Sequence, residues 1–166
     1  MTSNNVTRML DNRKITYTAF ELPPEKLGAL ETAALLKIDP ALVYKTIVVQ
    51  REKTGKAILA IVPGTAEVDL KLLATAVGEK KLHLPTEHEA EQLTGLQAGG
   101  ISPLALLNKG FQVVLDDSAQ AHSQIHISGG QRGLNIRLPV AALIELARAR
   151  LAKISQPHLS EPSPTT

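Results

Sequence analysis

The sequence predicts an α+β domain with a mixed, mostly antiparallel sheet. Three observations favour this class: about six strand-like segments, helical segments interspersed among them, and an order too irregular for a doubly wound parallel sheet. The chain has 166 residues, 43% hydrophobic and 20% charged, as expected for one packed domain. We therefore expect a single domain over residues 1–154 and a disordered, proline-rich tail over residues 155–166.

The first half of the chain alternates between helical and extended segments. Helices are expected over residues 4–13, 31–38 and 69–78, and strands over residues 15–20, 45–50 and 57–62. Ser3 or Asn4, and Asp69, are suited to cap helix N-termini, and Gly78 favours a helix end. The last two strands flank a turn containing Gly55 and are apolar on both faces, so we expect an antiparallel hairpin at the centre of the sheet.

The second half continues this irregular order. Short strands are expected over residues 82–84, 111–115, 124–128 and 134–138. Thr86 and Glu89 have the spacing of a capping box, which predicts a helix start. From Pro139 onward the sequence predicts one last helix, whose apolar face consists of Val140, Leu143, Ile144, Ala147, Leu151 and Ile154.

The composition excludes several classes of protein. The chain has no cysteine, which rules out disulfides, thiolate metal sites and cysteine nucleophiles. Its four aromatic residues are too few for a stacking platform for single-stranded nucleic acid, and its net charge of +2 gives no broad footprint for DNA. The N-terminus lacks the apolar stretch of a secretory signal, and no apolar run reaches the roughly 20 residues of a membrane span. We therefore expect a cytoplasmic protein that binds neither membrane nor DNA.

The common catalytic and cofactor motifs are missing. The glycine-rich residues 129–133 follow a predicted strand but precede another strand, so they lack the helix of a dinucleotide-binding fingerprint. Gln92 stands where a zinc-protease helix beginning at His88 would place its second histidine. His122 and His126 lie in an extended segment with no further ligand spaced nearby. We expect neither a metal nor a cofactor.

Lys45 is the first candidate for a chemical role. It opens the most apolar strand of the chain and lies on the same strand face as Ile47 and Val49. An ammonium group is rare on a covered face unless it has a partner or a task. The alternative is that Lys45 lies at the strand end and extends its amine into water.

Two loops combine glycines with hydroxyl residues. The first glycine loop is GGISP at residues 99–103, and the second glycine loop is SGGQRG at residues 128–133. Such loops let a ligand approach backbone N–H groups, which hold an anion or a developing oxyanion, and Arg132 can add a contact to a phosphate or carboxylate. The alternative is two tight turns whose glycines supply positive φ angles, with Arg132 in solvent.

Four motifs together resemble the YbaK/EbsC family, the freestanding relatives of the editing domain of bacterial prolyl-tRNA synthetases. They are YKT at residues 44–46, TG at 94–95, GGISPL at 99–104 and SGGQRGL at 128–134, and the similarity runs from about Val6 to Leu151. The resemblance implies a curved, barrel-like mixed sheet surrounded by helices. It also implies hydrolysis of the ester between a wrong amino acid and the 3′ end of a tRNA, and the branch most similar to this chain removes cysteine from the proline tRNA.

The resemblance also assigns site residues. Lys45 is the implied catalytic residue, and in the cysteine-specific branch the thiol of the substrate attacks its own ester carbonyl. The implied partners are the acceptor end of an aminoacyl-tRNA and prolyl-tRNA synthetase. The implied substrate-binding residues are Phe20, Tyr44, Thr46, Gly99, Gly100, Ile101, Ser102, Pro103, Ser128, Gly129, Gly130, Arg132 and Asn135.

The chain departs from the family pattern at two positions. Phe20 stands where many members have a tyrosine, and Asn135 stands where many have an acidic residue. The loss of a hydroxyl and of a charge leaves two other functions open. One is an editor specific for another small amino acid such as alanine. The other is a non-catalytic module that binds a tRNA end or a nucleotide.

Overall fold

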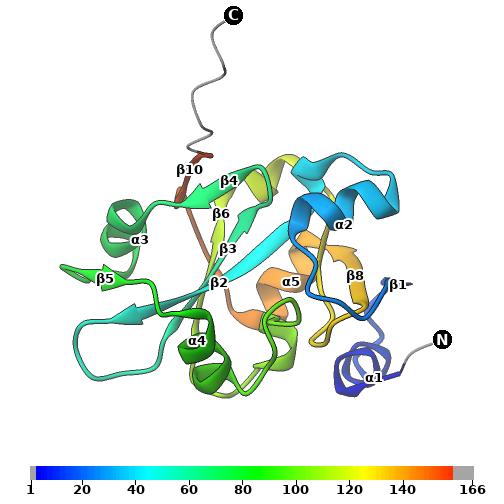
Figure 1. The fold of residues 1–166 in the computed structure, drawn as a ribbon, viewed down its shortest axis with the longest axis horizontal. Helices are drawn as coiled ribbons and strands as arrows, with labels where there is room; N and C mark the ends of the chain where they lie inside the picture. Colours follow the sequence, from blue (N-terminus) through cyan, green and yellow to red (C-terminus); the bar gives the residue numbers. More distant parts are fainter. Residues whose placement is uncertain (1–2, 159–166) are drawn as a thin grey trace, which may run out of the picture.

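The computed structural model describes residues 3–158, and its largest sheet has five strands in the order β5-β2-β3-β6-β9 (Figure 1). The strands are β2 (Tyr44–Arg51), β3 (Ile58–Pro63), β5 (Leu82–His83), β6 (Gln112–Asp116) and β9 (Arg150–Ala152). The expected β2–β3 antiparallel hairpin is confirmed, whereas β3–β6 and β6–β9 are parallel pairs. Residues 58–62 of β3 are fully buried because an apolar cluster covers each face of the sheet, as their two-sided apolar pattern predicted.

Two smaller sheets complete the architecture. One is antiparallel with the order β1-β8-β7, and the other pairs β10 with β4. A parallel bridge between Val43 and His126 joins the three-stranded sheet to the start of β2. These sheets do not close into a barrel within the described part of the chain, and the predicted mixed α+β class is confirmed. The strands are β1 (Thr18–Glu21), β4 (Ala66–Val68), β7 (Gln124–Ser128), β8 (Leu134–Pro139) and β10 (Ser155–Pro157).

Three helix starts and one helix end agree with the predicted capping residues. The Asn4 and Asp69 side chains accept hydrogen bonds from the first turns of α1 and α3, and Thr86 and Glu89 form the expected capping box of α4. Gly78 ends α3 in the left-handed conformation. The helices are α1 (Asn5–Asn12), α2 (Ala29–Leu36), α3 (Leu70–Val77), α4 (Glu87–Thr94) and α5 (Val140–Ala147). Figure 1 shows α2 close to the start of β2.

The C-terminal region differs from the prediction. The last helix does not continue to Ile154, because Arg148 adopts a left-handed conformation (φ 50°) and ends α5 at Ala147. The next residues form β9 beside β6, so the apolar residues 151 and 154 pack as part of sheet and loop rather than on a helix face. The disordered tail that we expected from residue 155 is also wrong at its start, because Ser155–Pro157 pair with β4. The remaining tail residues, 159–166, lie outside the described part.

Candidate active site

A cavity of about 270 Å³ lies between the start of β2, the two glycine loops and the segment that leads into α2. Its volume is slightly below the roughly 300–1,000 Å³ of most small-molecule sites, and its walls combine apolar side chains with a few polar groups as such sites do. The structure thus brings together residues far apart in the sequence. The predicted site residues that line the cavity are Tyr44, Lys45, Thr46, Gly99, Ile101, Ser128 and Asn135.

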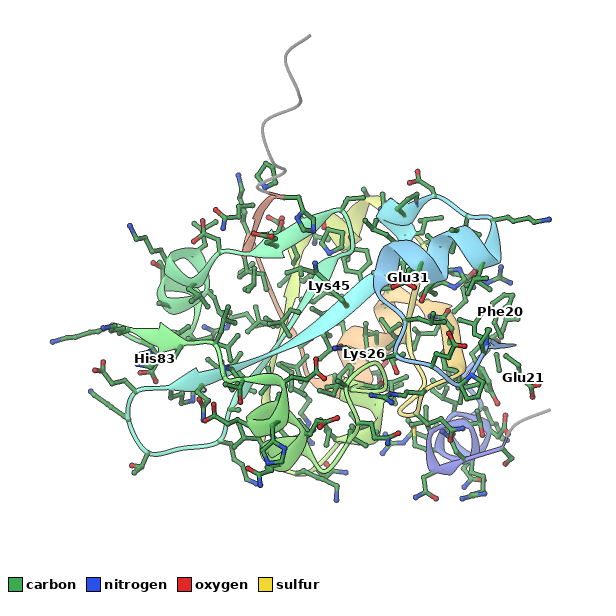
Figure 2. The ribbon with its side chains drawn as sticks, in the orientation of Figure 1. Phe20, Glu21, Lys26, Glu31, Lys45 and His83 are labelled. Atoms are coloured by element: carbon green, nitrogen blue, oxygen red, sulfur yellow. The ribbon has the colours of Figure 1, made fainter. Side chains whose placement is uncertain are left out.

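Lys45 is the cationic residue of this cavity wall. In β2 it pairs with Val62 of β3. Its side chain is on the same strand face as Ile47 and Val49, which belong to one of the two apolar clusters that cover the sheet. Burial lowers the pKa of the Lys45 amine, and the nearby Glu67 carboxylate on β4 partly offsets this shift. Figure 2 shows Lys45 on the first part of β2. Lys45, whose amine is partly desolvated, therefore lines a half-open cavity.

The two neighbours of Lys45 contribute differently. Tyr44 is buried, and its hydroxyl forms a 2.8 Å hydrogen bond with Ser118 Oγ. Burial raises the pKa of the Tyr44 phenol, which remains neutral and forms part of the wall. Thr46 Oγ1, by contrast, is buried and has no hydrogen-bond partner within residues 3–158. A buried hydroxyl without a partner has a free-energy cost, so Thr46 is an unsatisfied polar group beside the cavity.

The two glycine loops are in direct contact with each other. A Cβ placed on Gly100 would lie 2.9 Å from backbone atoms of Gln131, so only glycine permits this approach. Arg132 reinforces the contact, because its Nε donates a 2.7 Å hydrogen bond to the carbonyl of Ala98. Arg132 does not line the cavity. Through this bond Arg132 links the two loops, and its contact with an anion stays a prediction.

Several other predicted site residues shape the loops and do not reach the cavity wall. The Ser102 hydroxyl is fully buried and caps the short helical turn Pro103–Ala105 by accepting a hydrogen bond from Leu104 N. Gly129 donates its N–H to the Leu134 carbonyl. The residues of this kind are Gly100, Ser102, Pro103, Gly129, Gly130 and Arg132.

Phe20 also lies away from the cavity wall. Its ring centroid is 5.4 Å from that of His126, and the guanidinium of Arg137 lies 5.6 Å from the Phe20 ring centroid. Figure 2 shows Phe20 on β1, apart from Lys45. Phe20 therefore packs between two polar side chains of the three-stranded sheet.

Sequence reasoning missed one wall of the cavity. Leu22, Glu25 and Leu27 line it from the segment between β1 and α2, and Ala29 and Thr32 line it from α2. This segment carries no pattern that points to chemistry, apart from the carboxylate of Glu25. Its position depends on tertiary contacts. Gly133 approaches the Leu22 carbonyl so closely that a Cβ at position 133 would lie 2.9 Å from the carbonyl oxygen, and Lys26 forms an ion pair with Glu87.

Two classes of site are not seen in the described residues. Residues 3–158 contain no group of three or more histidine, aspartate or glutamate side chains that could hold a metal ion. No helix in the same range has the length and apolar character to cross a membrane.

Comparison with known families identifies the fold. Residues 24–146 match the family model described as the aminoacyl-tRNA editing domain, and this range includes β2, both glycine loops and every cavity-lining residue except Leu22. The chain belongs to this family. The resemblance drawn from the YKT, GGISP and SGGQRG motifs is therefore confirmed, and the chain is an aminoacyl-tRNA editing domain.

Individual relatives agree with this family. The chain is 35% identical, over 91% of its length and 92% of the relative, to the Enterococcus faecalis protein named "Putative Cys-tRNA(Pro)/Cys-tRNA(Cys) deacylase EbsC". A solved structure described as a "putative trans-editing enzyme for prolyl tRNA synthetase" matches with a TM-score of 0.77 and 25% identity, over 94% of this chain and 99% of the other. The hypothetical protein APE2540 shares the fold, with a TM-score of 0.83 and 23% identity over 92% of this chain and 100% of the other.

Proposed function

We propose that this editing domain is a trans-acting deacylase that clears mischarged tRNA, with Cys-tRNA(Pro) as its substrate. The observation that supports the proposal is that Lys45 and residues of both glycine loops line one half-open cavity. The 35% identity to the relative from Enterococcus faecalis supports cysteine as the amino acid, because that relative is named for cysteine-charged tRNAs.

The chemistry of an aminoacyl ester suits this cavity. The ester is already activated, so positioning and stabilisation of the developing oxyanion supply much of the catalysis. In the proposed step the substrate thiol sulfur attacks the ester carbonyl carbon. The bond between that carbon and the ribose oxygen breaks, and the thiol proton ends on the ribose oxygen. The thiolactone that forms is then opened by water, which gives free cysteine and uncharged tRNA.

Lys45 and the two glycine loops have roles in that step. The Lys45 ammonium holds an oxygen of the substrate and orients the ester for attack. Gly99 and Ser128, one from each glycine loop, line the same cavity. No metal is needed, since the nucleophile belongs to the substrate.

Selectivity for the tRNA body is proposed to come from prolyl-tRNA synthetase. The net charge of +2 is modest for a protein that would grip a whole tRNA through its phosphates. A domain that binds chiefly the acceptor end needs few such contacts. Adding the synthetase should therefore increase the preference for Cys-tRNA(Pro) over Cys-tRNA(Cys), and an unchanged ratio would contradict this partnership.

A panel of mischarged tRNAs tests the proposed function. The purified protein is incubated with Cys-tRNA(Pro), Ala-tRNA(Pro) and Pro-tRNA(Pro), and release of each labelled amino acid is followed. We expect rapid loss of cysteine only. Hydrolysis of the alanyl ester as fast as the cysteinyl ester would rule out the thiol-assisted route, and tight binding without ester loss would indicate a binding module.

A further inference from the structure

A buried histidine lies directly behind the cavity and makes contact with one of its wall residues. On one face of the three-stranded sheet, Ser128 of β7 and Phe20 of β1 both lie opposite Asn135 of the central strand β8. His126 lies two residues before Ser128 on this same face and is 3% exposed. His126 Nδ1 is 2.8 Å from Asn135 Oδ1. Asn135 is 5% exposed and lines the cavity.

The hydrogen bond determines the tautomer of His126 and the orientation of Asn135. An amide oxygen only accepts hydrogen bonds, so the proton must be on His126 Nδ1. Burial, the dominant effect, and the nearby Arg137 lower the pKa of His126, while the bond to Asn135 raises it in part. Phe20 packs against the imidazole ring and fixes its plane. The imidazole thus holds Asn135 Oδ1 on the side away from the cavity.

The amide nitrogen of Asn135 then remains for a ligand. Within residues 3–158, Asn135 Nδ2 has no protein hydrogen-bond partner, and it is not among the buried side-chain atoms left unpaired. It therefore reaches the open space that Asn135 lines. We propose that His126 is a positioning residue that orients Asn135, so that Asn135 Nδ2 donates a hydrogen bond to an oxygen of the bound aminoacyl ester. This inference rests on the proposed function and assigns it a second donor beside Lys45.

A donor at this point suits the charge that develops during the reaction. The ester carbonyl oxygen becomes negative as the sulfur attacks, and an amide N–H stabilises that charge. The bond from His126 keeps the amide oxygen of Asn135 away from the cavity, so the side chain presents its donors to the ligand.

The tautomer is measured first, because it does not depend on the substrate. The ¹⁵N spectrum of histidine-labelled protein identifies which ring nitrogen carries the proton, and the signal of His126 is assigned by its loss in His126→Asn. We expect the Nδ1–H form. An Nε2–H form would overturn the proposal, because Asn135 would then point its amide nitrogen at the imidazole.

Matched variants test the function of the pair. His126→Leu and His126→Asn have side chains of similar shape, but only the asparagine keeps a donor near the position of Nδ1. We expect kcat for Cys-tRNA(Pro) to fall about tenfold to a hundredfold in His126→Leu and in Asn135→Leu, with KM little changed, and to recover largely in His126→Asn. The exposed His88→Leu serves as a surface control.

The outcomes are separable. Equal losses in His126→Leu and His126→Asn, in variants that melt like the parent, would show a packing role and contradict the proposal. Full activity in Asn135→Leu would contradict the proposal as well, and this variant provides the test if His126→Leu does not fold. A parent inactive on every charged tRNA would refute the proposed function, whereas the tautomer measurement would still report on the His126–Asn135 pair.

Discussion

The contact between the glycine loops predicts a specific effect of Gly100→Ala. Gly100 is buried and does not have a positive φ, so alanine causes no backbone strain of its own. The new methyl group, however, would lie 2.9 Å from the C and Cα atoms of Gln131 and 3.0 Å from Arg132 N. Favourable contacts between carbon atoms lie near 3.5–4.0 Å, so the loops must separate by roughly 0.6 Å or more. Because these atoms belong to the backbone, no rotamer change relieves the clash.

The separation affects both stability and catalysis. Overpacking of this kind costs about 1–3 kcal/mol of folding free energy. A shift of this size in loops that line the cavity should also reduce kcat/KM for the mischarged tRNA by about tenfold to a hundredfold. Urea denaturation measures the first quantity, and release of labelled cysteine from Cys-tRNA(Pro) measures the second.

Gly78→Ala is the matched control. Gly78 has a φ of +74° and open space where a Cβ would lie, so alanine there costs about 1 kcal/mol through backbone strain at the end of α3, outside the cavity. We expect a similar loss of stability with full activity. If Gly100→Ala is destabilised but fully active, the loop contact does not set the site geometry. If Gly78→Ala loses activity equally, the effect reflects global destabilisation.

Three further predictions concern Lys45, its surroundings and the second glycine loop. Lys45→Met removes the charge and keeps the shape of the side chain, so the rate of deacylation should fall about a hundredfold or more. The lowered pKa of Lys45 means that folding disfavours the charged amine, so thermal denaturation of this variant at neutral pH should show no loss of stability. If the ammonium form of Lys45 is active, activity falls as the pH rises through its lowered pKa. Glu67 raises that pKa, so Glu67→Gln should move the alkaline limb of the pH–rate profile to lower pH. A limb that does not move would exclude the ammonium role. Asn4→Ala removes both the α1 cap and the 2.9 Å hydrogen bond to the Gly129 carbonyl, so urea denaturation should show a loss of about 2 kcal/mol in the free energy of unfolding. In the control variant Arg8→Ala the free energy of unfolding should stay unchanged.

Local signals in the sequence predicted most of the elements. The caps at Asn4, Asp69 and Thr86 fixed helix starts because each side chain bonds to its own first turn. The two-sided apolar pattern of β3 correctly indicated a central strand, because such a pattern requires cover on both faces. Lys45 was found because a charged residue on an apolar strand conflicts with its surroundings.

The predictions that failed depended on long-range contacts. The 3.6-residue spacing of Leu151 and Ile154 resembled a helix face, but pairing of β9 with β6 determines their structure. The bond by which Arg132 links the two glycine loops was not predicted either, because its acceptor Ala98 is 34 residues away in the sequence. His126 appeared only as half of a rejected metal pair, because nothing local shows that β7 and β8 bring it to Asn135. Such groupings require the register of the strands.

The most direct test is a crystal structure of the protein with a non-hydrolysable amide analogue of 3′-cysteinyl adenosine. The account predicts that the analogue occupies the cavity, with a carbonyl oxygen or hydroxyl of the ligand within hydrogen-bond distance of Lys45 Nζ and its backbone against both glycine loops. An analogue bound at another surface, or bound in the cavity with the Lys45 amine turned away from it, would contradict the account.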